Sequence, residues 1–320
     1  MPPLFWRKRT ATPQRPDSLA EPLNFDALFE PAFLTALQPF ALRINQAQKG
    51  GRLAEHRTAA RGQGTEFVDF KPYAPGDDLR AIDWNIYRRL GRVFVRAFEE
   101  RQDMPVYFLI DRSRSLYIED PPRIHAGLRA TLALAAVALE QHDSVRLFPF
   151  SDGMTPHFRT ASGKAALLRV AHSLAGYEAA GGTDLAASLT HLTSLNLRQG
   201  LVVVVSDFFN ANGVDPVVHA LEHLRHRVLL VQLTKHHDAD PSLHPGLFGD
   251  VVIEDGETGS RTPVTVTPDL VGRYKAAYRH FNDRLTQFAN RRGAGLARLD
   301  ADKPVLDQLS LLFGTGGTAL

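Results

Sequence analysis

Short apolar segments alternate with longer helical patterns from residue 105 to the end of the chain. The apolar segments predict strands at 106–110, 144–150, 155–160, 201–206, 227–233 and 295–300. Between them, apolar positions recur at helical spacing and predict helices at 124–141, 162–175, 184–197, 214–226, 268–292 and 303–313. Fully apolar strands that alternate with helices are typical of a parallel sheet covered on both faces. We therefore expect an α/β domain built on a doubly wound sheet.

The hydrophobic pattern differs in three other segments. Residues 25–48 have apolar positions at helical spacing, and Pro39 predicts a break in that helix. Residues 92–98 alternate apolar and basic side chains, which predicts a strand at an edge or with one exposed face. Two β-type segments flank a turn at Gly256–Gly259, and they predict a β-hairpin inserted at about 240–267.

These patterns divide the chain into three parts. Residues 1–24 are rich in proline and basic side chains, which predicts a disordered tail or an arm that contacts a membrane surface or a partner. Residues 25–103 form a helical and β-rich extension, and residues 104–320 form the α/β domain. Because only a short connection separates 92–98 from 106–110, we expect these two strands to pair or pack together. We also expect the aromatic residues of the extension to be buried against the domain; they are Phe67, Phe70, Tyr73, Trp84 and Tyr87.

The composition excludes several classes of protein. The 320 residues include 44% hydrophobic and 22% charged side chains, which is ordinary for a globular protein. The chain has no cysteine, so disulfides, thiolate zinc sites and cysteine nucleophiles are excluded. A net charge of +2 is too small to indicate nucleic-acid binding. The apolar segments are shorter than a membrane span and the N-terminus lacks a signal-peptide core, so we expect a cytoplasmic protein without a transmembrane segment.

Oxygen-bearing side chains follow the predicted strand at 106–110. Asp111, Ser113 and Ser115 stand at alternate positions there, so they can turn three oxygens towards one point. Ligands of an open parallel sheet bind at the carboxyl ends of its strands, near the switch in strand order. The same pattern also fits an ordinary polar turn between a strand and a helix.

Two further residues favour a metal site. Thr183 lies in a glycine loop directly before a predicted helix, and Asp207 follows the strand at 201–206. If this strand is a neighbour of the one at 106–110, both side chains join the three oxygens described above. A set of oxygen ligands with bound waters suits Mg²⁺ or Mn²⁺.

The order of these elements resembles a von Willebrand factor A-type domain with a metal-ion-dependent adhesion site. The resemblance rests on the D-x-S-x-S motif that begins at Asp111, on Thr183 before its helix and on Asp207 after its strand. It implies the strand order 3-2-1-4-5-6, in which the first and fourth strands are neighbours. It also implies that the metal keeps one open position, which a partner carboxylate completes.

The segment GQGTEFVDFKPYAPGDDLRAIDWNIYRRLGRVFVRAFEER (62–101) closely resembles the signature of the bacterial "domain of unknown function 58" family. Members of this family are von Willebrand A-like proteins that are often encoded beside MoxR-type AAA+ ATPases. The likeness covers about residues 45–320. It implies a MoxR-type ATPase as partner and a chaperone-like role in the assembly or remodelling of client proteins.

Arg112 and Arg114 depart from the pattern, because small or neutral residues are more usual at these two positions of the motif. Two interpretations follow from their charge. The arginines repel a metal ion and leave a metal-free adaptor, or they form a rim that attracts an acidic partner.

Charged residues of the 66–85 segment also have two interpretations. Asp77, Asp78 and Arg80 either belong to a structural network of ion pairs or form a docking surface for the ATPase. The adjacent carboxylates of Asp77 and Asp78 suggest acid–base catalysis only as a minor alternative. A loop with His236, His237 and His244 similarly suggests a soft-metal site as a minor alternative.

We therefore expect a non-enzymatic, metal-dependent protein-binding module. One alternative is a Mg²⁺-dependent hydrolase that uses the same oxygens, for which Asp152 and Asp184 are the candidate general bases. The other alternative is a structural adaptor that needs no metal.

Overall fold

A computed structural model describes residues 4–8, 24–50, 61–75, 77–99, 103–154, 160–244 and 246–314. The chain forms two compact units. The first unit combines residues 1–47 with residues 104–320, and the second contains residues 48–103. Residues 25–47 therefore group with the α/β part, which corrects the predicted extension over 25–103. Among the described helices, none is both long enough and apolar enough to cross a bilayer.

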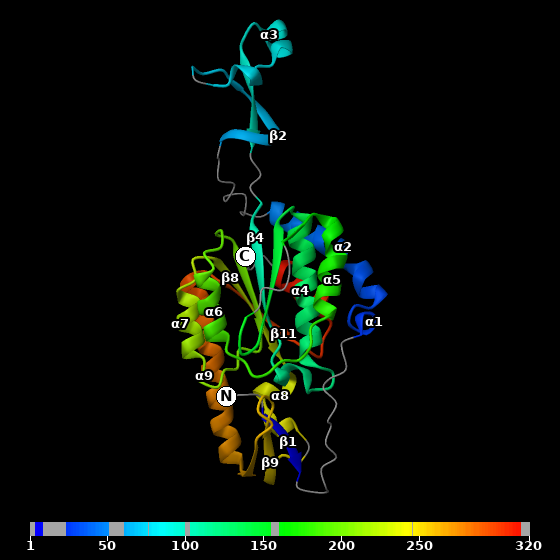
Figure 1. Cartoon of the computed structure of the whole chain (residues 1–320), viewed down its shortest axis with the longest axis vertical. Coiled ribbons are helices and arrows are strands. Elements are labelled where there is room, and N and C mark those ends of the chain that lie inside the picture. The colour runs from blue at the N-terminus through cyan, green and yellow to red at the C-terminus, as the bar shows by residue number, and fades with distance from the viewer. Residues whose placement is uncertain are drawn as a thin grey trace. The chain divides into compact units, whose positions relative to one another are not determined.

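A six-stranded sheet forms the centre of the first unit (Figure 1). Its strands are, in spatial order, β11 (Gly295–Asp300), β8 (Arg227–Thr234), β7 (Leu201–Ser206), β4 (Pro105–Asp111), β5 (Ser144–Phe150) and β6 (Ala161–Ser162). The first five strands are parallel, and β6 runs antiparallel to β5. Read along the chain, this is the order 3-2-1-4-5-6. The strand predicted at 155–160 lies mostly outside the described residues.

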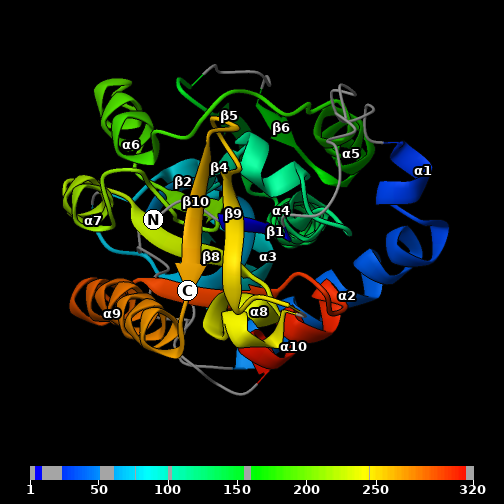
Figure 2. The ribbon, with the colours of Figure 1, turned by 90° about the horizontal axis from the view of Figure 1, so that it is seen from below.

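Helices cover both faces of the sheet, as Figures 1 and 2 show. One face carries α4 (Arg123–Glu140), α5 (Leu167–Ala175) and α10 (Val305–Gly314). The other face carries α6 (Leu185–Ser194), α7 (Asp215–Glu222) and α9 (Pro268–Arg292). Val106, Phe108 and Ile110 of β4 face the first layer, while Tyr107 and Leu109 face the second. This two-sided burial explains why the strands are continuously apolar.

Helices α1 (Phe25–Leu28) and α2 (Pro31–Gly50) add to the first layer. Helix α2 continues through Pro39, so the predicted break is wrong. The proline removes one backbone hydrogen bond, but the helix buries Leu37, Phe40 and Ile44 against the core on either side of it. Arg129 of α4 also donates to Leu28 O at 2.7 Å, which fastens the segment to the domain.

The predicted hairpin is present as β9 (Gly249–Asp255) and β10 (Arg261–Val266). Strand β1 (Leu4–Lys8) pairs antiparallel with the other edge of β9 and completes a three-stranded sheet. The prediction of disorder is therefore wrong for residues 4–8, because the open edge of β9 supplies backbone partners for them. Residues 9–23 lie outside the described part of the chain. Helix α8 (His236–Ala239) precedes the hairpin.

The second unit contains a two-stranded ribbon and short helices. Strand β2 (Arg61–Pro72) pairs antiparallel with β3 (Phe94–Glu99). Between them lie a 3-10 helix (Leu79–Ala81) and α3 (Trp84–Leu90). The prediction that the strand near 92–98 pairs with 106–110 is wrong, because β5 and β7 already occupy both edges of β4. Further 3-10 helices occur in the first unit at Arg114–Tyr117, Lys164–Ala166 and Pro241–Leu243.

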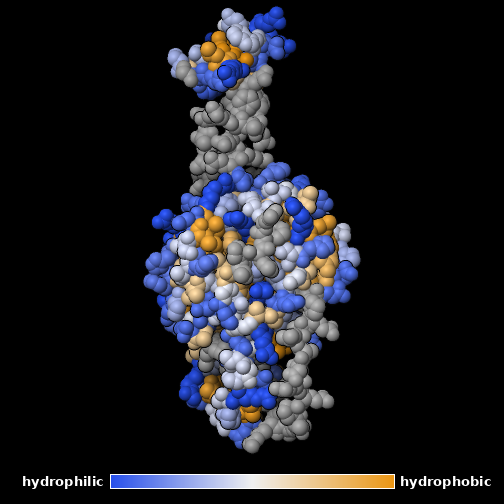
Figure 3. All heavy atoms as spheres, viewed as in Figure 1, coloured by the Kyte–Doolittle hydropathy of each residue, from blue (hydrophilic) through white to orange (hydrophobic). Residues whose placement is uncertain are grey.

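Three of the five aromatic residues that were predicted to be buried are exposed side chains of the second unit. Trp84 is 62% exposed, and Tyr73 and Tyr87 are also exposed. Phe70 is half-buried, and the side chain of Phe67 lies outside the described part. The space-filling view shows an apolar patch on the surface of this unit (Figure 3).

Candidate functional site

The candidate site lies at the carboxyl ends of two adjacent strands. Asp111 ends β4 and Asp207 follows β7, so the pairing of these strands brings both residues to one edge. Ser113 and Ser115 belong to the turn after β4, and Thr183 lies in the loop before α6. All five side chains are buried, and Asp111 is 0% exposed.

Four hydrogen-bonding contacts centre on the Asp111 carboxylate and its turn. Ser206 Oγ donates to Asp111 Oδ2 at 2.6 Å, and the Ser113 backbone N–H donates to Oδ1 at 2.9 Å. Thr183 Oγ1 lies 3.3 Å from Asp111 Oδ1. The hydroxyls of Ser113 and Ser115 are 3.1 Å apart. The structure thus brings together the oxygens of Asp111, Ser113, Ser115 and Thr183. It adds Ser206, which the sequence analysis missed although this residue directly precedes Asp207.

Asp207 has one carboxylate oxygen without a partner. Its Oδ1 accepts a hydrogen bond from Phe209 N–H at 3.0 Å. Its Oδ2 is buried and has no hydrogen-bond partner in the described part of the chain. Burial raises the pKa of Asp207 well above its ordinary value, and the nearby charge of Asp111 raises it further, although Arg123 opposes both effects. Burial also raises the pKa of Asp111, against the hydrogen bond from Ser206. Two buried acidic groups therefore interact at a point where a cation would relieve their repulsion.

A third acidic residue, Glu257, reaches the site from the hairpin turn. Its Oε2 accepts a hydrogen bond from the Thr183 N–H at 3.3 Å. Burial raises the pKa of Glu257 to about 7, with further contributions from Asp111 and Asp152. This residue could not be predicted from the sequence, because no local pattern indicates that a hairpin at 249–266 lies against a loop at 181–183.

The glycine loop passes between two carboxylates. A Cβ added to Gly182 would lie 3.1 Å from Asp152 Oδ1 and 3.1 Å from Glu257 Oε2. A Cβ on Gly181, where φ is +22°, would overlap the Asp152 carboxylate. The absence of side chains at these two positions thus allows Asp152 and Glu257 to approach the backbone. Asp184 has another role, because its Oδ1 accepts from Ala187 N–H at 2.9 Å and caps α6.

The two arginines of the motif have other surroundings than the buried oxygens. The Arg112 guanidinium lies 5.8 Å from the centre of the Tyr177 ring, and Nη1 is 3.5 Å from Glu178 O. Arg114 is exposed. Within the described residues, neither arginine forms an ion pair with Asp111 or Asp207.

Asp77, Asp78 and Arg80 lie in the second unit. Asp77 accepts from Lys71 Nζ at 2.5 Å and from Ala74 N–H at 3.0 Å, and these contacts lower its pKa. Asp78 caps the 3-10 helix by accepting from Arg80 N–H at 2.9 Å. Both carboxylates thus stabilise the local turn, which agrees with the structural interpretation of this segment.

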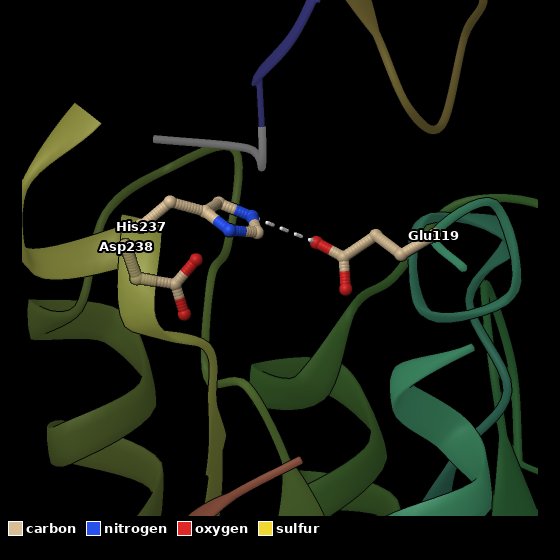
Figure 4. Close-up of side chains that lie close together, drawn as sticks. All are labelled: Glu119, His237 and Asp238. Atoms are coloured by element: carbon tan, nitrogen blue, oxygen red, sulfur yellow. Dashed lines mark ion pairs between the residues drawn. The ribbon is translucent and has the colours of Figure 1, made fainter. Parts of the chain in front are cut away.

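A separate group of acidic and histidine side chains consists of Glu119, His237 and Asp238 (Figure 4). One ligand atom from each lies within 4.8 Å of the others, which is close enough to hold a metal ion. However, buried Arg123 donates to Asp238 through two bonds of 2.9 Å and to Glu119 at 2.7 Å. Lys235 Nζ lies 3.6 Å from Glu119. These cations already neutralise both carboxylates, so we interpret the group as an ion-pair network.

This chain matches one protein family and several known proteins. The model of the family described as "Protein of unknown function DUF58" matches residues 69–284. Uncharacterized protein Mb1516 of Mycobacterium bovis is 26% identical over 259 residues, covering 78% of this chain and 80% of the relative. Uncharacterized protein Rv1480 of Mycobacterium tuberculosis matches to the same extent.

Solved structures that match part of this chain include the conserved hypothetical protein BatB from Bacteroides thetaiotaomicron. It has a TM-score of 0.37 and 13% identity, and the match covers 66% of this chain and 100% of BatB. An aerotolerance-related membrane protein from Bacteroides fragilis has a TM-score of 0.35 and 14% identity, with 59% of this chain and 98% of that protein covered.

Proposed function

This chain belongs to the DUF58 family, and from the site it carries we propose that it is a non-enzymatic protein-binding module that depends on a divalent cation. The cation lies between the ends of β4 and β7 and keeps one coordination position for an acidic side chain of a partner. The single observation that supports this most strongly is the Asp207 Oδ2 atom, which is buried beside Asp111 without a hydrogen-bond partner among the described residues.

The donor atoms fit a hard cation. Carboxylate and hydroxyl oxygens are the ligands that Mg²⁺ and Mn²⁺ prefer, and the site contains no nitrogen or sulfur donor among its proposed ligands. We assign Asp111, Ser113, Ser115, Thr183 and Asp207 to hold the cation directly or through water. The resemblance to a von Willebrand factor A-type adhesion site and the sheet order of the first unit support this assignment.

The proposed partner is suggested by the family resemblance and not by the site residues. The family resemblance suggests a MoxR-type AAA+ ATPase in the cytoplasm, with assembly or remodelling of client proteins as the outcome. A partner carboxylate would fill the open position on the cation, which would make the interaction dependent on the metal.

A metal-dependent hydrolase is the second candidate, and one observation favours it. Glu257 lies at the site with its pKa raised to about 7, which suits a general base at neutral pH. Of the two bases suggested by the sequence, Asp184 is committed to capping α6, and Asp152 lies against the glycine loop.

One experiment separates these functions. Capture of the purified MoxR-type ATPase is measured with the full-length protein in Mg²⁺ and in EDTA, and with the variant Asp111→Asn in Mg²⁺. Asp269→Asn is the control, because Asp269 is an exposed residue of α9. The proposal predicts capture in Mg²⁺ only, loss of capture in Asp111→Asn and retention in Asp269→Asn. Capture that is equal in EDTA would favour the metal-free adaptor. Turnover of phosphate or peptide substrates with Mg²⁺ would favour the hydrolase.

A further inference from the structure

The hairpin β9–β10 brings a carboxylate to the site from outside the parallel sheet. The hairpin lies at the carboxyl edge of the sheet, as both views of the ribbon show (Figures 1 and 2). Its turn carries Glu257, whose Oε2 lies 3.3 Å from the Thr183 backbone nitrogen. The same oxygen would lie 3.1 Å from a Cβ on Gly182. Glu257 thus contacts the loop that also carries the proposed ligand Thr183.

The turn is built to hold this residue in place. Asp255 Oδ1 accepts from the N–H groups of Glu257 at 2.9 Å and Thr258 at 2.8 Å. Gly259 adopts a φ of +69°, which closes the turn. Beneath the turn, β9 is paired on both edges, by β1 and β10. A small apolar cluster that includes Val251 and Ile253 packs the hairpin. The packed hairpin therefore fixes the position of the Glu257 backbone.

Neighbouring carboxylates act on the charge of Glu257. Asp111, Asp152 and Asp255 all act on it electrostatically. Among the described residues, no lysine, arginine or histidine forms an ion pair with Glu257. A half-buried carboxylate in an acidic surrounding is unfavourable without a positive charge nearby. A divalent cation at the neighbouring site supplies that charge.

We propose that Glu257 is an internal ligand that occupies the coordination position otherwise offered to a partner's acidic side chain. This inference rests on the proposed metal site. Glu257 has a long side chain that is only half-buried, and its hydrogen bond to Thr183 is long, so a partner carboxylate can displace it. Binding of a partner then requires the Glu257 side chain to withdraw, and the hairpin competes with the partner for the metal.

The test uses Mn²⁺ as probe with the full-length protein. Calorimetry measures the affinity for Mn²⁺, and the water-proton relaxation rate of the bound ion measures how many coordination positions water occupies. We expect Glu257→Gln to weaken Mn²⁺ binding by about tenfold and to increase the relaxation rate, because water replaces the carboxylate. Acetate added to the Mn²⁺-loaded protein should bind more tightly to Glu257→Gln than to the wild type.

The matched control is Glu254→Gln on the same hairpin. The Glu254 carboxylate accepts from Arg261 Nε at 2.9 Å within the hairpin, so this variant should leave the Mn²⁺ affinity and the relaxation rate unchanged. If Glu257→Gln equals the wild type in both measurements while Asp111→Asn abolishes binding, the metal site stands and the role of Glu257 is refuted. If the wild type binds no Mn²⁺, the proposed function and this inference both fail.

Discussion

Ser206 Oγ donates a hydrogen bond of 2.6 Å to Asp111 Oδ2, and this bond joins the carboxyl ends of β7 and β4. Both residues are buried, with exposures of 1% for Ser206 and 0% for Asp111. Ser206 Oγ also accepts from Phe208 N–H at 2.9 Å, so the same hydroxyl fixes the loop that carries Asp207. The orientation of the Asp111 carboxylate therefore depends on a side chain outside the D-x-S-x-S motif.

Replacing Ser206 by alanine should destabilise the metal-free protein. The substitution leaves Asp111 Oδ2 without its shortest hydrogen bond in a buried position, and such a loss costs about 1–3 kcal/mol. Urea unfolding of Ser206→Ala against the wild type measures the difference. Ser194→Ala is the control, because Ser194 is exposed and its loss should change stability by less than about 0.5 kcal/mol. Equal stability of Ser206→Ala and wild type would contradict the structural role of this bond.

The buried ion-pair network around Arg123 should be far more sensitive than surface pairs. Arg123 is 1% exposed and contacts both Glu119 and Asp238. Its replacement by glutamine leaves Asp238 without its counter-charge and Glu119 with only the more distant Lys235, which costs about 3–5 kcal/mol. Arg261→Gln removes an exposed pair with Glu254 and should cost at most about 1 kcal/mol. Denaturant unfolding of both variants compares them, and similar losses would show that the network contributes no more than a surface pair.

The same network predicts a dependence of stability on pH. The ion pair with Glu119, 3.6 Å from His237 Nε2, raises the pKa of His237 above its ordinary value of 6.5. The folded protein therefore holds this proton more tightly than the unfolded chain. The stabilisation is complete below pH 6.5 and is lost as the pH rises through the folded-state pKa. Although burial opposes it, the ion pair with His237 and the hydrogen bonds from Arg123 lower the pKa of Glu119 to about 2. Its contribution to stability is therefore lost only as the pH falls from 4.5 towards 2.

Thermal unfolding of the wild type and of His237→Gln between pH 5 and pH 9 tests the direction of this pH dependence. The wild type should unfold at a higher temperature than His237→Gln at pH 5.5, and the difference should disappear at alkaline pH. His219→Gln is the control, since His219 lies on the exposed face of α7. A difference that grows with pH would contradict the assignment.

The parallel sheet could be predicted because its strands are buried on both faces. The apolar segments of β4 and β7 have no polar side that would suggest another fold, and the residues after them lie at the predicted edge. The positions of Asp111 and Asp207 follow from this local pattern. By contrast, Glu257 reaches the site through a contact between a hairpin and a distant loop, which leaves no trace in either segment.

The predictions for Trp84 and Pro39 were wrong because they rested on local sequence preferences. Trp84 is large and apolar, which suggested burial, but it lies on the short helix α3 and is 62% exposed. Pro39 suggested a helix break, but burial of Leu37 and Phe40 outweighs the lost hydrogen bond. Local preferences alone therefore did not predict the exposure of Trp84 or the continuity of α2 at Pro39.

The most direct test of the metal site is a calorimetric titration of Mg²⁺ into the full-length wild type and into Asp207→Asn. We expect one site in the wild type with a dissociation constant in the micromolar to millimolar range, about −4 to −8 kcal/mol, and no binding in Asp207→Asn. Because the folded-state pKa of Asp207 is raised, ionisation of this residue destabilises the metal-free protein at pH 8. The variant should therefore be at least as stable as the wild type without metal. Equal Mg²⁺ binding by the wild type and Asp207→Asn, or no binding by the wild type, would contradict the account.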